Sequence, residues 1–224
     1  MLFRSFWEQY ERIHGSKVAA PKDGKQFLAD DHVTPQVQLD ELQEFVKQRV
    51  AKSEGHTFHI VEVGSWKGAS AIAMAKVNHR VRVTCVDTWQ GSSSDHTLVR
   101  ASEEDVYSAF YENLKNSGVF SQISVRPGKS TDVAKDWDGG KVDMIFIDAN
   151  HTYEAVKEDI AAWWPLLMPD GVMIGHDYRT TNFPGVDKAV HEAFGGRVKS
   201  YGASQPYGCF WVVEASDEPS VPAK

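Results

Sequence analysis

Short apolar runs recur along the chain and alternate with stretches in which apolar residues repeat every three or four positions. The run Phe58–Val63 is apolar with little alternation, as expected of a strand buried on both faces of a parallel sheet. The stretches between such runs have the spacing of helices that cover a sheet. Further strands are predicted at 81–87, 123–125, 144–147, 172–174, 198–201 and 209–214. The pattern therefore predicts an α/β fold.

Amphipathic helices are predicted between and before these strands. The segment Leu2–His14 mixes both charge signs on its polar side, which favours packing on the domain or on a dimer partner over membrane contact. The polar segment 15–35 is predicted to be a loop. Helices are predicted around 42–50, 69–75, 106–114, 153–167 and 184–195, with Ser102 and Asp105 as a capping box for the third of these.

The central strand stops at Gly64, and Ser65 is predicted to cap the alanine-rich helix that follows. Free backbone N–H groups at such a turn lie outside the carboxyl end of the strand, where open α/β sheets bind ligands. A dinucleotide site would need G-x-G-x-x-G, but the second glycine position is Trp66. This indole and the carboxylate of Glu62 suit a diphosphate badly and favour a cationic ligand. The alternative is a glycine that only ends the strand.

Acidic residues close several of the predicted strands. Asp87 follows the glycine turn by twenty-odd residues, which places it to accept hydrogen bonds from the hydroxyls of an adenosine ribose. The alternative is a carboxylate that caps a loop. Asp148 ends a buried strand, and His176 and Asp177 end the next one. The long polar segment 88–101 is predicted to form a lid over a pocket at this edge of the sheet.

The 224 residues carry a formal charge of −7, with a pI near 5.7. Binding to phosphate backbones needs a basic face, so nucleic acid is a poor candidate partner. The two cysteines do not make a disulfide framework, and a reduced, cytoplasmic setting is expected. A membrane association is not expected either, because no apolar run is long enough to span a bilayer.

Glu62, Gly64 and Gly68 resemble the E-x-G-x-x-x-G motif of the class I S-adenosylmethionine-dependent methyltransferases. The passage IDANHTYEAVKEDI…LLMPDGVMIGHDY resembles the metal-dependent small-molecule O-methyltransferases, including antibiotic-sugar methyltransferases and cephalosporin-hydroxylase-like proteins. The resemblance implies a Rossmann-like, seven-stranded, mostly parallel sheet with helices on both faces, over residues 58–214. Residues 1–57 are then expected to form a helical cap segment, and residues 215–224 a flexible tail.

The same resemblance implies S-adenosylmethionine as methyl donor and a small hydroxylated acceptor, such as a sugar or glycosylated metabolite. A homo-oligomer formed through the N-terminal helix is also predicted. The predicted cofactor contacts are Glu62, Gly64, Ser65, Trp66, Gly68, Asp87, Thr88, Gly128, Ser130 and Asp148.

His151, three residues past Asp148, is the predicted general base, although a helix-capping or metal-ligating histidine is an equal alternative. Asp148 and His176 are further catalytic candidates. A divalent cation, Mg²⁺ or Mn²⁺, is predicted at Asp148, His176 and Asp177. His176 departs from the carboxylate that the resemblance implies at its position, so it is either a ligand to Mn²⁺ or a bystander or base. A dinucleotide-dependent oxidoreductase and a non-catalytic ligand-binding protein on the same fold remain the alternative functions.

Overall fold

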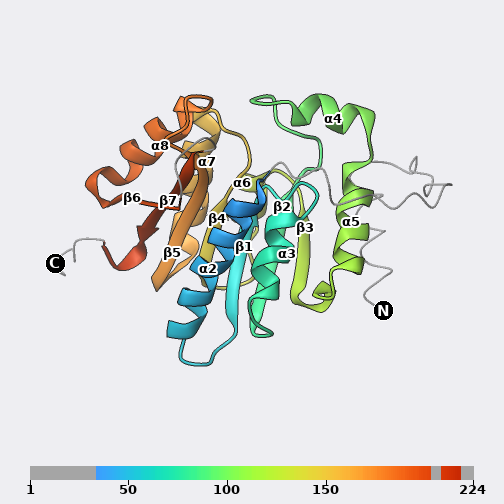
Figure 1. Ribbon diagram of the computed structural model, residues 1–224. Coiled ribbons are helices and arrows are strands. Elements are labelled where there is room, and N and C mark those ends of the chain that lie inside the picture. The colour runs from blue at the N-terminus through green and yellow to red at the C-terminus, as the bar shows by residue number, and fades with distance from the viewer. Residues whose placement is uncertain (1–33, 203–207, 218–224) are drawn as a thin grey trace.

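The computed structural model of the protein describes residues 34–202 and 208–217, in which seven strands form one sheet in the order β3-β2-β1-β4-β5-β7-β6 (Figure 1). β1 pairs in parallel with β2 and β4, and only β7 runs antiparallel to its neighbours in this described sheet. The strands are β1 (Phe58–Val63), β2 (Val81–Asp87), β3 (Ile123–Pro127), β4 (Val142–Ile147), β5 (Leu167–Tyr178), β6 (Lys199–Tyr201) and β7 (Cys209–Glu214). The predicted seven-stranded, mostly parallel α/β fold is confirmed.

Helices cover both faces of the sheet. They are α2 (Gln36–Lys52), α3 (Ala69–Lys76), α4 (Thr97–Glu103), α5 (Val106–Asn116), α6 (Ser130–Lys135), α7 (Tyr153–Trp163) and α8 (Pro184–Phe194), with 3-10 turns at Phe120–Gln122, Trp164–Leu166, Gly195–Arg197 and Ala215–Asp217. One hydrophobic core joins α2, α3 and α5 to the sheet, and a second joins α6, α7 and α8 to its other face. β1 contributes to both cores, because neighbouring residues such as Ile60 and Val61 point to opposite faces.

The strand order creates a crevice above the middle of the sheet. The chain leaves the central β1 outward to β2 and β3, then returns to the other side of β1 as β4. At such a switch in strand order, the connecting loops part in opposite directions and leave room for a ligand at the carboxyl ends. Figure 1 shows α4 above this same edge of the sheet. The strand order therefore places the ends of β1, β2, β4 and β5 around one opening.

Two predicted helix caps are wrong. α3 begins at Ala69 after Gly68, which occupies the N-cap position with φ of 85°, so Ser65 lies too early in the turn to cap it. Asp105 caps α5 by accepting a hydrogen bond from the Ser108 N–H at 3.0 Å. Ser102 instead belongs to α4, so the predicted capping box does not form.

Several segments also differ from the prediction. The predicted lid segment 88–101 is not all loop, because α4 begins within it. The helix predicted to continue to Leu167 ends at Trp163, where a 3-10 turn containing Pro165 leads into β5. A proline lacks the N–H that a longer helix would need. The short helix α6 after β3 was not predicted.

The predicted helix Leu2–His14 and most of the loop 15–35 lie outside the described residues. α2 confirms the second predicted helix of the N-terminal segment. The predicted tail begins as a 3-10 turn at Ala215–Asp217, and its last residues lie outside the described part of the chain. Within residues 34–202 and 208–217, no helix has the length and apolar character needed to cross a membrane.

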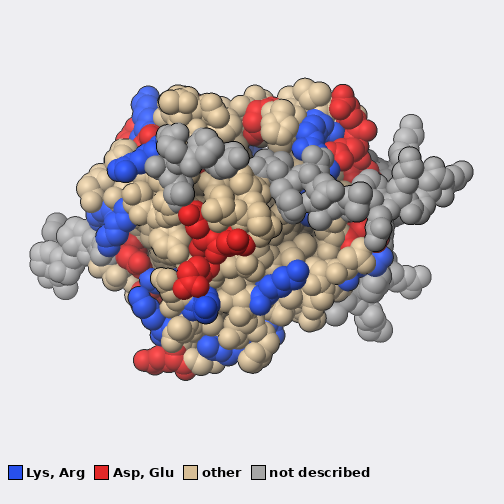
Figure 2. Space-filling view, in the orientation of Figure 1, with Lys and Arg blue, Asp and Glu red and all other residues tan. Residues whose placement is uncertain are grey.

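The two cysteines, Cys85 and Cys209, are buried and free. On the face shown in Figure 2, Lys and Arg side chains lie in small separate groups, with Asp, Glu and other residues between them. The described residues on this face therefore form no continuous basic surface of the kind that binds nucleic acid.

Candidate active site

A cavity of about 1460 Å³ opens at the carboxyl edge of the sheet. It is lined by residues from the ends of β1, β2, β4 and β5, from α2, and from the segment that joins β2 to α4. Most of the predicted site residues line it. Those residues are Gly64, Ser65, Trp66, Asp87, Thr88, Gly128, Ser130, Asp148, His151, His176 and Asp177. Segments far apart in the sequence thus share one opening that can hold a small molecule.

The turn after β1 depends on a glycine at position 64. Gly64 has φ of 92°, and a Cβ added there would lie 2.2 Å from the backbone oxygen of Asp148. The Asp148 N–H in turn donates to the Val63 carbonyl at 2.8 Å. A side chain at Gly64 would therefore strain the backbone and push the end of β4 away. Gly68 has φ of 85° and faces the ring of Phe110, where a Cβ would approach to 3.0 Å.

Asp87 links the first two strand ends. One carboxylate oxygen accepts hydrogen bonds from the N–H groups of Ser65 and Trp66, both at 2.8 Å, and the other accepts from the Trp89 N–H at 2.7 Å. Burial raises the pKa of Asp87, and these hydrogen bonds oppose the rise. Asp87 thus holds the glycine turn as well as lining the cavity. Its predicted ribose contact stays a prediction.

Glu62 lies beneath the glycine turn. Its side chain is fully buried and accepts hydrogen bonds from Ser70 Oγ at 2.5 Å and from Cys85 Sγ at 3.5 Å. Burial raises the pKa of Glu62 to about 7. Glu62 therefore does not line the cavity, and its position fits support of the turn better than the predicted direct contact with a cofactor.

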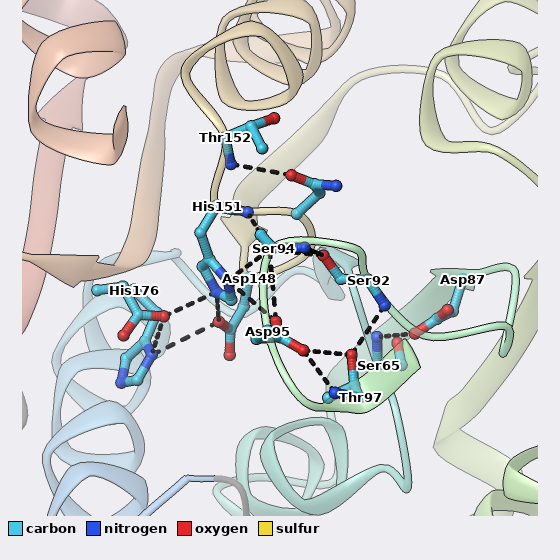
Figure 3. Close-up of polar contacts among 12 residues, drawn as sticks. Ser65, Asp87, Ser92, Ser94, Asp95, Thr97, Asp148, His151, Thr152 and His176 are labelled. Carbon is cyan, nitrogen blue, oxygen red and sulfur yellow. Dashed lines mark hydrogen bonds and ion pairs between the residues drawn. The ribbon is translucent and has the colours of Figure 1, made fainter. Parts of the chain in front are cut away.

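Two carboxylates and two imidazoles meet at the ends of β4 and β5 (Figure 3). His151 Nε2 lies 2.9 Å from Asp177 Oδ2 and 3.9 Å from Asp148 Oδ1. His176 Nδ1 lies 3.1 Å from Asp177 Oδ2 and 3.5 Å from Asp148 Oδ1. All four side chains are at most 16% exposed. The predicted convergence of Asp148, His176 and Asp177 thus occurs in the structure, with His151 as a fourth member.

The charges of this cluster reinforce one another. Burial alone would lower the pKa of His151, but hydrogen bonds to Asp148, Asp177 and Asp95 raise it to about 11. The pKa of His176 is lowered by burial and raised by Asp148 and Asp177, to about 10. In return, the pKa values of Asp148 and Asp177 are held below their usual range by the two imidazoles, against the effect of burial. In the metal-free protein an imidazolium with so high a pKa cannot accept a proton at neutral pH, which weighs against His151 as a base acting alone.

His151 is held on three sides. Its Nδ1 lies 3.2 Å from both Asp95 Oδ2 and Ser94 Oγ, and its backbone N–H donates to Ser94 Oγ at 3.1 Å. The ring of Phe183 stacks on the imidazole, with 4.1 Å between the ring centroids. Nδ1 is therefore occupied by the segment before α4, and Nε2 faces Asp148 and Asp177. Sequence reasoning did not single out Asp95, Ser94 or Phe183.

The segment that contains Asp95 is itself well ordered by hydrogen bonds. Asp95 Oδ1 accepts from the N–H of Thr97 at 2.7 Å and from its Oγ1 at 2.5 Å. Ser92 joins the same network by donating its N–H to Thr97 Oγ1 at 2.8 Å (Figure 3). Earlier in this segment, Trp89 is buried and donates from Nε1 to the Trp66 carbonyl at 2.8 Å. The predicted lid segment is thus anchored to both the glycine turn and the imidazole cluster.

The acidic and imidazole groups suit a divalent cation. One ligand atom each from Asp148, His151 and Asp177 lie within 4.8 Å of one another. This set contains His151 in place of the predicted His176, whose Nδ1 faces the same carboxylates while its Nε2 is buried without a hydrogen-bond partner. Two carboxylate oxygens and one imidazole nitrogen match a metal of the Mn²⁺ or Mg²⁺ type. Asp95 on Nδ1 of His151 supplies the orienting partner that a ligating imidazole usually has.

The β3 end of the cavity carries the two remaining predicted contacts. The Gly128 N–H donates to the Asp87 carbonyl at 2.9 Å, so the turn after β3 lies beside the end of β2. Ser130 begins α6, and its Oγ accepts a hydrogen bond from Trp163 Nε1 at 2.8 Å.

Comparison with known proteins places this fold and cavity in a family. A family model described as a methyltransferase domain matches residues 61–178, which run from the second half of β1 to the end of β5 and include the whole imidazole cluster. The chain therefore belongs to the methyltransferase domain family, and its fold is that of the class I S-adenosylmethionine-dependent methyltransferases.

Solved structures show the same fold at low sequence identity. The O-methyltransferase NovP matches with a TM-score of 0.62 and 18% identity, over 78% of each chain. The O-methyltransferase TomG from Streptomyces achromogenes, solved with S-adenosylmethionine, matches with a TM-score of 0.57 and 18% identity, over 83% of this chain and 82% of TomG. An O-methyltransferase from Bacillus cereus, solved with SAH, matches with a TM-score of 0.59 and 20% identity, over 93% of this chain and 96% of the other.

Among curated proteins, the uncharacterized protein y4gI of Sinorhizobium fredii is 30% identical over 122 residues. The aligned segment is 53% of this chain and 13% of that protein. The chain thus corresponds to a small part of this relative's length.

Proposed function

We propose that the protein is an S-adenosylmethionine-dependent O-methyltransferase that acts on a small hydroxylated acceptor with the aid of a divalent cation. The observation that carries this proposal is the shared cavity. The glycine turn and Asp87 lie at the ends of β1 and β2, and the cluster around Asp148 lies at the ends of the neighbouring β4 and β5. A methyl donor and its acceptor need such adjacent sites, because the acceptor oxygen must approach the methyl carbon in line.

The first part of the cavity suits the donor. Glycine at position 64 keeps the turn free of side-chain atoms, which allows close approach of an amino-acid moiety. Asp87 is the predicted partner of the ribose hydroxyls, and the turn at Gly128 and Ser130 is the predicted base contact. The family match and the O-methyltransferases with bound S-adenosylmethionine or SAH support this assignment.

The second part of the cavity suits an acceptor hydroxyl that must lose a proton. A divalent cation held by Asp148, His151 and Asp177 would lower the pKa of a bound hydroxyl. Asp148 and Asp177 hold negative charge at neutral pH, because their pKa values are lowered. Asp95 and Phe183 contact the imidazole of His151 and hold it in place. The proposed metal ligand is therefore oriented before a cation or an acceptor binds.

The nature of the acceptor belongs to the same proposal. Uncharged polar side chains line the cavity, among them Gln36 and Gln43 of α2, Gln90, Asn116 of α5 and Asn182. Amide groups both donate and accept hydrogen bonds, as recognition of several hydroxyls requires. A sugar or glycosylated metabolite is therefore the proposed acceptor class. One of the structural neighbours, the calicheamicin protein CalS11, is described as a TDP-rhamnose 3'-O-methyltransferase, with 14% identity.

Calorimetry with S-adenosylmethionine and with S-adenosylhomocysteine tests the cofactor. We expect micromolar dissociation constants for both. Asp87→Ala should weaken binding by at least about tenfold, because it removes the proposed ribose contact and releases the N–H groups of Ser65 and Trp66. Binding of NAD with no response to either sulfur compound would instead support the oxidoreductase alternative.

An acceptor screen that measures release of S-adenosylhomocysteine tests the reaction and its metal. Activity should disappear with EDTA and return with Mg²⁺ or Mn²⁺. Asp177→Asn should lower turnover by about 100-fold or more and abolish the response to added metal, without loss of the folded state. Full turnover after thorough chelation would contradict the metal assignment and leave the methyltransferase assignment intact.

A further inference from the structure

The side chains around Asp148 form a ring in which oxygen and nitrogen atoms alternate. Asp177 Oδ2 lies 2.9 Å from His151 Nε2 and 3.1 Å from His176 Nδ1. Asp148 Oδ1 lies 3.9 Å from His151 Nε2 and 3.5 Å from His176 Nδ1. Each carboxylate thus has a nitrogen of each histidine as a neighbour. Atoms bound about 2.1 Å from one ion lie about 3 Å from their neighbours, so this spacing suits four ligands of a single cation.

An irregularity at the end of β5 turns His176 and Asp177 toward the same cluster. Successive side chains of a regular strand point to opposite faces of the sheet. Here the pairing of β5 with β7 shifts register between Gly175 and Tyr178, and Asp177 has φ of 56°. A residue other than glycine rarely adopts this conformation, and irregularities of this kind occur where a side chain must be re-aimed at a functional site. The backbone therefore brings one imidazole and one carboxylate to the same point.

His176 has polar contacts through one ring nitrogen. The residue is 8% exposed, and its ring packs against Phe210, with 5.2 Å between the ring centroids. Among the described residues, Nε2 has no hydrogen-bond partner, whereas Nδ1 faces both carboxylates. A buried polar group with a purely structural role usually has a hydrogen-bond partner. The contacts of His176 thus point to a role at the cluster, through Nδ1.

The surroundings of the cluster are unfavourable for Mg²⁺. Aromatic rings flank both imidazoles, since Phe183 stacks on His151 and Phe210 lies beside His176. The four polar side chains are at most 16% exposed. Mg²⁺ prefers oxygen ligands and usually keeps several of its waters, which two nitrogens between two aromatic rings do not provide for. Imidazole nitrogen is instead a good ligand for transition-metal cations.

We infer that His176 is a fourth ligand of the cation, through Nδ1, and that the two imidazoles make the site select a first-row transition-metal cation over Mg²⁺. This inference rests on the proposed function, because it takes the cluster to be a cation site, and it specifies the class of cation. Mn²⁺ is the weakest binder of the first-row series, so a preference for Mn²⁺ over Mg²⁺ is the strictest test. Fe²⁺ and Co²⁺ should bind more tightly still.

Two measurements on the metal-free full chain test the preference and its cause, without cofactor, acceptor or turnover. In calorimetry at neutral pH, Mn²⁺ should bind the wild-type protein about 30-fold more tightly than Mg²⁺, or better. Pulsed electron paramagnetic resonance of the bound Mn²⁺ counts the nitrogen atoms that are bound to the metal, and two are expected. A histidine that only supports the carboxylates from outside adds no bound nitrogen, so the count separates a ligand from a structural residue.

Two variants replace one ring nitrogen each by an oxygen without adding charge. The side-chain oxygen can take the place of Nδ1 in His176→Asn and of Nε2 in His151→Gln. Each variant should reduce the preference for Mn²⁺ by about fivefold or more and lower the nitrogen count to one. His96→Asn is the matched control, because His96 is an exposed histidine that lines the same cavity outside the cluster. It should keep both the preference and the count of two.

The outcomes separate this inference from the proposed function. If neither cation binds, the cation part of the proposed function fails and this inference fails with it, while binding of S-adenosylhomocysteine still decides the methyltransferase assignment. If Mn²⁺ and Mg²⁺ bind equally well, or if His176→Asn keeps two bound nitrogens, the cation site stands and selection by two imidazoles is overturned. If His176→Asn does not fold, the wild-type preference and nitrogen count decide the question, and a count of one overturns the inference.

Discussion

The two halves of the cavity are built in different ways. The half above β1, β2 and β3 is shaped by the backbone, with glycine at positions 64 and 128 and N–H groups gathered on Asp87. The half above β4 and β5 is shaped by charged side chains, namely two aspartates and two histidines. A backbone-built site tolerates few changes of shape, whereas a side-chain cluster depends on charge and on the partners that orient it. The two halves should therefore respond differently to substitution.

Gly64→Ala should have the largest effect. The added Cβ would meet the Asp148 backbone oxygen at 2.2 Å, in a residue with positive φ. We expect the free energy of unfolding to fall by about 3–5 kcal/mol, from backbone strain and overpacking together. Binding of S-adenosylhomocysteine should become undetectable by calorimetry, while urea unfolding measures the loss of stability.

Gly55→Ala is the matched control for this change. Gly55 has a similar φ of 87°, but a Cβ there meets no atom within 4 Å among the described residues. Its free energy of unfolding should fall by only about 1–2 kcal/mol, from backbone strain, and it should keep full ligand binding. Equal losses in both variants would show that the close approach to Asp148 has no energetic weight.

Asp95→Asn probes the side-chain half. Asp95 reaches His151 Nδ1 from the segment before α4, and no predicted cofactor contact depends on it. Turnover should fall by about 10–100-fold, the range seen when the orienting partner of a ligating histidine is removed. The dissociation constant of S-adenosylhomocysteine should not change. Once an acceptor is known, steady-state kinetics and calorimetry together separate the two effects.

Asp138→Asn serves as the control, because Asp138 is an exposed partner of Arg126 at the surface. It should leave both turnover and binding unchanged. A parallel loss of binding and turnover in Asp95→Asn would mean that Asp95 shapes the whole cavity and does not act through His151.

The backbone-built half was the easier one to predict. β1, Gly64 and the Asp87 strand end follow from local patterns: an apolar run, a glycine and an acidic residue that closes a strand. The structure nevertheless adds contacts that these patterns do not encode, such as the approach of Gly64 to Asp148, because they join residues far apart in the chain. The cap predicted at Ser65 was wrong for a local reason, because a serine before a helical stretch does not reveal where the turn ends.

The side-chain half was predicted only in outline. Asp148, His176 and Asp177 were found because strand ends meet at one edge of a parallel sheet. The cluster's further partner Asp95, which contacts His151, was missed. Asp95 comes from a polar segment without periodicity and lies 56 positions before His151 in the sequence. The one available signal was the length of that segment, which suggested a lid but not which residue would touch the cluster.

The dependence of stability on pH gives a smaller and more specific test of the side-chain cluster. The pKa values of His151 and His176 are raised to about 11 and 10, above the value near 6.5 expected in the unfolded chain. Their contribution to stability is therefore complete below about pH 6.5 and declines as the pH rises toward 10. The pKa of Asp177 is lowered, so its effect on stability depends on pH in the opposite direction. The contribution of Asp177 is present above about pH 4 and is lost on acidification. The cluster should stabilise the fold most between these limits.

Urea unfolding in EDTA at pH 6, 7, 8 and 9 measures this decline. As the pH rises above about 6.5, the free energy of unfolding falls by at most about 1.4 kcal/mol per pH unit for each histidine that stays protonated in the folded state. His151→Gln should make the decline shallower, whereas His79→Gln, at an exposed histidine, should leave it unchanged. Saturating Mn²⁺ should also flatten the decline, because a ligating imidazole is neutral at every pH in this range. If the decline is the same with EDTA and with Mn²⁺, the imidazole cluster does not bind the metal. Its charges would then only stabilise the fold.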